Sequence, residues 1–200
     1  MTDPRTGPAG NYYPKFSTRN PISRLLVSGF KQSLRDLTAS LGATSVLEVG
    51  CGEGFLAEFM MDITDASYTG VDLDLQITSA ARARCPAGGF AVADAHRLPF
   101  KSNSFDLVLA CEVMEHVPRP EDLLQEVRRV AREYCLFSVP REPLWRALNI
   151  ARGAYITSLG NTPGHIQHWG SGEFRKLLQG HVKIMETRHP IPWTMALCVV

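Results

Sequence analysis

The chain has 200 residues, of which 44% are hydrophobic and 20% are charged, and its formal net charge is +1. This length allows a single domain over residues 1–200 with a substantial core, and this composition is ordinary for a globular protein. The near-neutral charge argues against a nucleic-acid partner, and no apolar run approaches the roughly 20 residues that a membrane span needs.

The two ends of the chain and its cysteines bear on where the protein works. Residues 1–11 are polar and lack the apolar core of a signal peptide, so we expect residues 1–20 to form a flexible segment. The last residues stay apolar up to Val200, which fits a chain that continues or is truncated there. The scattered cysteines include no Cys-x-x-Cys pair, which favours buried free thiols in a reducing cytoplasm.

Helices and strands alternate in the predicted secondary structure. Apolar residues at helical spacing predict a first helix over residues 21–41, which Gly42 would end. Apolar, β-prone runs predict strands over 45–49, up to Val71, and over 90–93, 105–110 and 134–139. Further helices are expected from Phe55, over 75–84 and over 120–131. This alternation is typical of an α/β fold with a doubly wound, mostly parallel sheet in three layers.

After Pro140 the alternation changes. Residues 141–170 contain two prolines, several glycines, two tryptophans and two histidines. We expect this segment to be an insertion that covers the substrate, as functional loops often do. Another helix is predicted to begin around residue 171, with Ser171 as its N-cap.

The most informative motif is Val46-Leu-Glu-Val-Gly-Cys-Gly-Glu-Gly54, in which a short apolar strand leads into three glycines at alternate positions. Glycine permits positive φ and lets a ligand approach the main chain, and a strand, a glycine-rich turn and a helix N-terminus together make a nucleotide site. A tight turn without a ligand would use the same glycines. However, the next predicted strand ends at Asp72, near the offset at which an acid binds ribose hydroxyls.

Four segments, in order and spacing, resemble the class I S-adenosylmethionine-dependent methyltransferases, of the methyltransferase type 11 kind. They are residues 47–54, 70–74, 93–100 (Ala-Asp-Ala-His-Arg-Leu-Pro-Phe) and 104–117 (Ser-Phe-Asp-Leu-Val-Leu-Ala-Cys-Glu-Val-Met-Glu-His-Val). The resemblance is strong over about residues 40–140. It implies a seven-stranded, Rossmann-like sheet, which residues 183–188 and 193–199 would close as an antiparallel pair of strands.

The resemblance also implies which residues bind S-adenosylmethionine. The glycine-rich turn would lie under the methionine part, Asp72 would accept the ribose hydroxyls, and Asp94 would accept the adenine amine. Asp74 is a rival for the ribose, but Asp72 is favoured because it ends a strand. The implied cofactor-binding residues are Glu48, Gly50, Cys51, Gly52, Gly54, Asp72, Leu73, Asp94, Ala95 and Cys111.

The sequence Glu112-Val-Met-Glu115-His116 follows the strand over 105–110, at the sheet edge where ligands bind. If it turns helically, Glu112, Glu115 and His116 share a face and could hold Mg²⁺ or Mn²⁺. The pattern resembles the Glu-x-x-Glu-His metal site of ubiquinone-pathway and small-RNA O-methyltransferases, and residues 164–168 could add a ligand. The same pattern also occurs in the broad family without metal, where the histidine lines the substrate pocket.

Three histidines are candidate general bases, because an imidazole titrates near neutral pH: His116, His165 and His168. Each could equally be a packing residue. Tyr12 and Tyr13 could form a lid over the cofactor, and plain packing is the alternative.

These residues predict a methyltransferase that acts on a small molecule, most readily at an oxygen, because a hydroxyl needs a base or metal more than a thiol or amine does. The alternatives are an RNA or protein methyltransferase and a non-catalytic, cofactor-binding partner subunit. A nicotinamide-dependent oxidoreductase fits less well, since its fingerprint is usually Gly-x-Gly-x-x-Gly. The acceptor and the oligomeric state are not indicated.

Overall fold

A computed structural model describes residues 20–200, so the predicted flexible segment up to residue 19, with Tyr12 and Tyr13, lies outside the described residues. Within them, one sheet has seven strands in the order β3-β2-β1-β4-β5-β7-β6. Strands β1 to β5 run parallel to one another, and β7 runs antiparallel to both β5 and β6. The strands are β1 (Ser45–Val49), β2 (Ser67–Asp72), β3 (Gly89–Val92), β4 (Phe105–Cys111), β5 (Ala131–Pro140), β6 (Lys183–Arg188) and β7 (Trp193–Val199).

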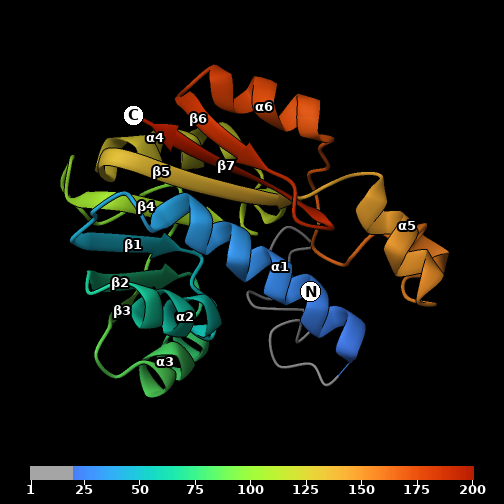
Figure 1. Cartoon of the computed structure of the whole chain (residues 1–200), viewed down its shortest axis with the longest axis horizontal. Helices are drawn as coiled ribbons and strands as arrows, with labels where there is room; N and C mark the ends of the chain where they lie inside the picture. The colour runs from blue at the N-terminus through green and yellow to red at the C-terminus, as the bar shows by residue number, and fades with distance from the viewer. Residues whose placement is uncertain (1–19) are drawn as a thin grey trace, which may run out of the picture.

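Helices cover both faces of this sheet (Figure 1). They are α1 (Pro21–Thr38), α2 (Phe55–Ile63), α3 (Leu75–Arg84), α4 (Pro120–Val130), α5 (Leu144–Ala151) and α6 (Ser171–Gln179), with 3₁₀ turns η1 (Met114–His116) and η2 (Ile156–Ser158). On one face α1, α2 and α3 bury residues such as Phe30 against Leu109 of β4. On the other, α4 and α6 bury residues such as Phe174 against Ala110. Neighbouring strand residues point to opposite faces, so the predicted three-layer fold is confirmed.

Most of the predicted elements appear within one to three residues of their expected bounds. The main surprise lies in the predicted insertion, where residues 144–151 form helix α5. The predicted cap of α6 is also different: Gly170 is the N-cap, its N–H donates to Glu173 Oε2 at 2.9 Å, and Ser171 pairs instead with Thr194 of β7. All five cysteines are free and buried, as expected, and none of the helices in residues 20–200 is both long and apolar enough to cross a membrane.

Candidate active site

The glycine-rich turn between β1 and α2 has a conformation that requires glycine. Gly50, Gly52 and Gly54 have φ values of +72°, +53° and +79°. A Cβ atom on Gly50 would lie 2.4 Å from the side chain of Val113, so the turn also has no room for a larger residue there. The backbone at Gly50 and Cys51 donates to the carbonyl of Val71, which fixes the turn at the carboxyl end of β2.

Asp72 holds this turn through its carboxylate. Its Oδ2 accepts the N–H of Gly52 at 2.9 Å, and its Oδ1 accepts the N–H of Leu73 at 2.8 Å. The rival acid, Asp74, caps α3 by accepting the N–H groups of Gln76 and Ile77. Of the two acids only Asp72 lines the large cavity described next, which supports the choice of Asp72 over Asp74.

A cavity of about 1240 Å³ opens at the carboxyl edge of the sheet. Its lining includes the glycine-rich turn and the ends of β2 and β4, and on the other side parts of α1 and α5. This volume exceeds the roughly 300–1,000 Å³ of a pocket for one drug-sized ligand, so the cavity has room for two molecules. Nine of the ten predicted cofactor residues line it; the tenth, Gly54, faces Ala81 of α3 instead.

Glu48 reaches the cavity from inside the sheet, with 2% of its surface exposed. The hydroxyl of Tyr68 donates to Glu48 Oε2 at 2.7 Å. Burial raises the pKa of Glu48 to about 8; the Tyr68 hydrogen bond opposes this rise and the charge of Asp72 adds to it. Glu48 is therefore protonated at neutral pH in the absence of a ligand.

Asp94 lies farther along the same side of the cavity. Its Oδ1 accepts both the backbone N–H of His96, at 2.9 Å, and the ring Nδ1–H of His96, at 2.8 Å. The backbone hydrogen bond is the main cause of a lowered pKa for Asp94, which stays a carboxylate and hence an acceptor. Leu73, which also lines the cavity, is 66% exposed and offers an apolar surface there.

The end of β4 does not bring together the predicted trio of Glu112, Glu115 and His116. Glu112 has a φ of +60°, so the helical turn η1 begins only at Met114. The Glu112 carboxylate accepts the indole N–H of Trp193 at 2.6 Å and the hydroxyl of Ser138 at 3.1 Å. The predicted set thus needs correction: the carboxylate of Glu112 is directed to β5 and β7, because its backbone is left-handed rather than helical.

A different trio does converge among the described residues. One ligand atom from each of Glu115, His116 and His165 lies within 4.8 Å of the others, and Glu115 is only 1% exposed. His116 Nδ1 donates to the carbonyl of Gly164 at 3.0 Å, and its Nε2 lies 3.9 Å from Glu115 Oε1. We call Glu115, His116 and His165 the Glu-His-His cluster.

The segment after α5 folds back to bring His165 into this cluster. The N–H groups of Ile166 and Gln167 donate to the carbonyl of Glu115 at 2.9 and 3.1 Å. The His165 ring lies edge-on to His116 with centroids 4.8 Å apart, and it stacks on Trp145 at 5.8 Å. The third predicted histidine, His168, is not in the cavity lining and bonds to Asn161 Oδ1 at 2.8 Å.

One residue of the site, Tyr68, was missed from the sequence, and the helix that carries Trp145 was not predicted. Tyr68 partners Glu48 from within a strand, and no motif marks it. Trp145 of α5 lines the cavity, and the helical spacing of Leu144, Leu148 and Ala151 could have revealed this helix. Trp193 also lines the cavity, whereas Trp169 packs on Phe174, with ring centroids 6.1 Å apart.

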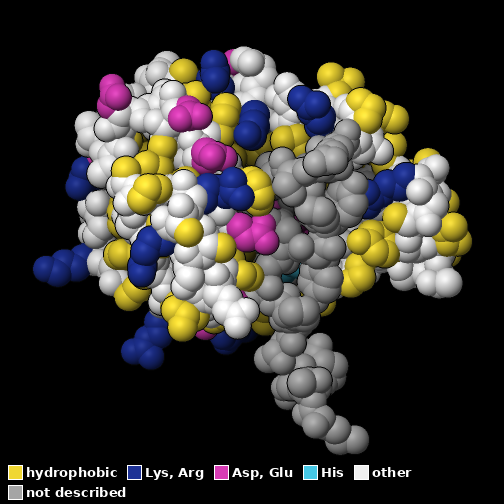
Figure 2. Space-filling model, turned by 90° about the horizontal axis from the view of Figure 1, so that it is seen from below, with side chains coloured by type: hydrophobic (Ala, Val, Ile, Leu, Met, Phe, Trp, Pro, Cys, Tyr) yellow, Lys and Arg dark blue, Asp and Glu magenta, His cyan; other side chains and the backbone are white. Residues whose placement is uncertain are grey.

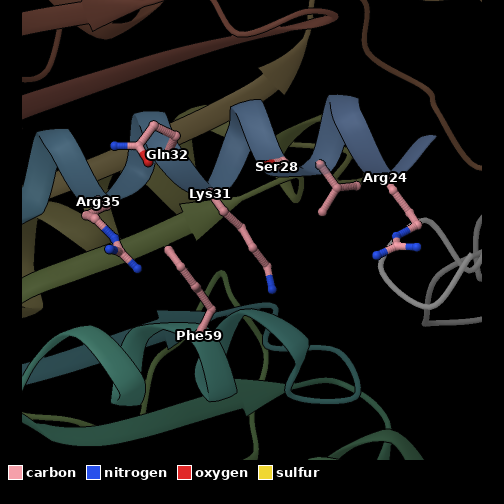
Figure 3. A pocket seen from close by; sticks show the side chains of 7 residues that line it. Arg24, Ser28, Lys31, Gln32, Arg35 and Phe59 are labelled. Atoms are coloured by element: carbon pink, nitrogen blue, oxygen red, sulfur yellow. The ribbon is translucent and has the colours of Figure 1, made fainter. Parts of the chain in front are cut away.

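A second hollow, of about 350 Å³, lies between α1 and α2 (Figure 3). Arg24, Lys31 and Arg35 project into it from α1. The Lys31 ammonium is 5.0 Å and the Arg35 guanidinium 5.6 Å from the ring centre of Phe59 on α2. These cation–π contacts join the two helices, and no carboxylate or histidine lines the hollow, so we place the chemistry in the larger cavity.

Comparison with known proteins agrees with this fold. Residues 47–138 match the family model described as a methyltransferase domain. Methyltransferase GfsG of Streptomyces halstedii is 32% identical over 127 residues, which is 60% of this chain and 45% of that protein. The fatty-acid O-methyltransferase of Mycolicibacterium smegmatis is 39% identical over 97 residues, which is 47% of this chain and 35% of that protein. The chain thus spans less than half the length of these two relatives.

A similar fold occurs in the solved structure of magnesium protoporphyrin IX methyltransferase (ChlM) from Synechocystis PCC 6803 with bound SAH. The TM-score is 0.67 at 18% sequence identity, over 92% of this chain and 89% of that one. The matched segment and the seven-stranded sheet agree with the predicted resemblance to the class I S-adenosylmethionine-dependent methyltransferases.

Proposed function

We propose that this chain binds S-adenosylmethionine and transfers its methyl group to a hydroxyl of a small molecule. The residues present fit the cofactor: a turn that only glycine can make, an acid at the end of β2, and an apolar side chain beside it. When bound, S-adenosylmethionine supplies an electrophilic methyl group on its sulfonium sulfur. The observation that carries the choice of a hydroxyl is the Glu-His-His cluster just beyond β4.

In this proposal His116 is the general base. Because a carbonyl can only accept, the bond to Gly164 keeps a proton on Nδ1, so Nε2 would be the nitrogen that takes the proton of the acceptor hydroxyl. Glu115, 3.9 Å from Nε2, stabilises the imidazolium that forms. Holding the hydroxyl in line with the methyl group supplies a further part of the rate enhancement.

The same cluster is also a candidate metal site, with a different ligand set from the predicted one. Two imidazoles and one carboxylate suit Mn²⁺, Fe²⁺ or Zn²⁺ better than Mg²⁺, which prefers oxygen ligands. A divalent ion held there would lower the pKa of the acceptor hydroxyl and orient it. Glu115, His116 and His165 would hold the ion, and Glu112 would not.

The relatives favour a small acceptor. The fatty-acid O-methyltransferase, which is 39% identical over 97 residues, is named for an oxygen acceptor. An RNA or protein methyltransferase is the alternative. Among the residues that line the two hollows, the one cluster of basic side chains that could support it is in the second hollow and consists of Arg24, Lys31 and Arg35. A non-catalytic partner subunit would bind the cofactor without forming a methylated product.

The cofactor site is tested by calorimetric titration with S-adenosylhomocysteine. We expect Asp72→Asn to weaken binding by about tenfold or more, because a charge-assisted hydrogen bond to the ribose is lost. Asp74→Asn is the matched control, since asparagine caps a helix as well as aspartate does, and its affinity should stay within about twofold. A folded wild-type chain that does not bind would refute the proposal.

The role of His116 is tested by methyl transfer to a panel of hydroxyl compounds. We expect His116→Gln to lower kcat by about a hundredfold or more while S-adenosylhomocysteine still binds. His168→Gln, outside the cavity, is the control and should retain activity. If a chelator abolishes activity and Mn²⁺ or Zn²⁺ restores it, the reaction depends on a metal ion. If activity is unchanged by the chelator, His116 acts as the base without a metal ion.

A further inference from the structure

Part of the cavity wall consists of apolar and aromatic side chains from three elements. We call this part the acceptor chamber, and its walls are Leu26, Val27, Phe30, Trp145, Leu148 and Trp193. The first three come from α1, the next two from α5, and the last from β7. A molecule in the chamber would therefore contact side chains of both α1 and α5.

The aromatic walls form a continuous path to the reacting groups. Phe30 and Trp193 meet edge-on with centroids 5.1 Å apart, and Trp193 lies 6.0 Å from Trp145. Trp145 in turn stacks on His165 of the Glu-His-His cluster at 5.8 Å. An acceptor whose oxygen reaches His116 would thus have the rest of its body against apolar rings.

Charged side chains are largely confined to the other side of the cavity or are already engaged. Glu48, Asp72 and Asp94 lie on the cofactor side. On the chamber side, Glu112 accepts bonds from Trp193 and Ser138, and Arg152 at the mouth donates to Asn149 Oδ1 at 2.8 Å. A polar acceptor would leave its own groups unpaired against these walls, which is costly.

Exposed apolar side chains occur in the cavity lining and near it. Ile22 and Ile166 line the cavity and are 68% and 55% exposed. Ile156 and Leu159 follow α5 outside the lining and are 60% and 73% exposed, and apolar side chains gather where α5 lies (Figure 2). Exposed apolar side chains at the rim of a pocket mark a place where an apolar ligand or surface is met.

We infer that the acceptor is an elongated apolar molecule with a hydroxyl at one end, such as a long-chain alcohol or another lipid-like alcohol. Its hydroxyl lies at the Glu-His-His cluster, its chain fills the acceptor chamber, and longer chains extend to the rim formed by Ile22 and Ile166. This inference rests on the proposed function, because it names the substrate class of the same site.

The test measures the affinity for n-butanol, n-octanol and n-dodecanol, with and without S-adenosylhomocysteine. Binding is detected as a change in tryptophan fluorescence, to which Trp145 and Trp193 of the chamber contribute. We expect affinity to rise about threefold to fourfold for each added methylene until the chamber is filled. Catechol and glycerol serve as polar comparators and should bind weakly. Affinity that does not depend on chain length, or a preference for catechol or glycerol, would overturn the inference.

Variants in the two walls locate the site. Leu148→Trp on α5 should weaken n-dodecanol binding about tenfold by filling the chamber, and Leu26→Trp on α1 should do the same. Met185→Trp, on an exposed part of β6, is the control. S-adenosylhomocysteine affinity, measured on each variant, reports correct folding; undiminished n-dodecanol binding in both wall variants contradicts the inference. A wild-type chain that shows the chain-length dependence without binding S-adenosylhomocysteine contradicts the proposed function alone.

Discussion

Glu48 combines burial with a role at the cofactor side of the cavity. Its side chain is enclosed within the sheet, next to the Tyr68 hydroxyl and near the charge of Asp72. A carboxyl group in such a place keeps its proton unless a cation approaches, and the ammonium of a bound methionine moiety would be such a cation. Under the proposed function, binding of the cofactor would therefore be coupled to the ionisation of Glu48.

This burial predicts a pH dependence of stability. In the unfolded chain Glu48 ionises near its ordinary pKa of 4.5, whereas in the folded chain its pKa is about 8. The unfolded state therefore loses a proton first, and stability falls as pH rises from about 4.5 to about 8. Glu48→Gln lacks this ionisable group. As pH rises across that window, the free energy of unfolding of the variant should therefore increase relative to that of the wild type, by on the order of a few kcal/mol.

The measurement is urea unfolding of both proteins at several pH values from about 5 to about 8. Glu58→Gln, at an exposed position of α2, controls for loss of a carboxylate in general. Parallel stability curves for the wild type and Glu48→Gln would show that Glu48 does not keep its proton in the folded chain.

At the scale of elements, α5 and the loop after it are held by a small buried polar group. Asn149 is 3% exposed; its amide N–H donates to the carbonyl of Gly160 at 2.8 Å, and its Oδ1 accepts from Arg152. From the same helix, the indole N–H of Trp145 donates to the hydroxyl of Thr162 at 2.9 Å. These bonds close the loop over residues 152–162 onto α5 and so keep the wall of the acceptor chamber in place.

Asn149→Ala should loosen this loop without unfolding the sheet. The substitution leaves the Gly160 carbonyl and Arg152 without their partner, a cost of about 1–3 kcal/mol borne by the loop. We expect limited trypsin cleavage to become faster at Arg152, while S-adenosylhomocysteine affinity changes little. Ser158→Ala, at an exposed position of the same loop, is the control. Cleavage that starts instead within the sheet would mean that Asn149 supports the whole domain.

The sequence predicts the parts of this molecule whose signals are local. Strand β1, the glycine-rich turn and Asp72 follow from a continuous apolar run, glycine chemistry and a fixed offset, and the structure has them together. Glu112 shows what local pattern misses: its direction depends on a single left-handed residue and on Trp193, 81 positions later in the chain. His165 is brought to Glu115 by the long-range backbone bonds of the residues that follow it. The sequence could therefore name His165 as a candidate but could not select it over His168.

For the whole molecule, ligand binding should appear as stability. A ligand that binds only the folded state, at a hundredfold excess over its Kd, adds about 2.7 kcal/mol. For a domain of this size we expect S-adenosylhomocysteine to raise Tm by about 5–10 °C in a thermal scan. NADH at the same concentration should leave Tm unchanged; a shift with NADH and none with S-adenosylhomocysteine would instead favour the oxidoreductase.

The backbone bonds between Glu115 and residues 166–167 have a consequence for evolution. They join the segment after α5 to η1 through main-chain groups, which every amino acid except proline can supply. Side chains of the segment can thus be exchanged over generations while the reacting groups keep their places. Acceptor preference is free to diverge among descendants of such a chain, while the turn that requires glycine at residue 50 must persist in all of them.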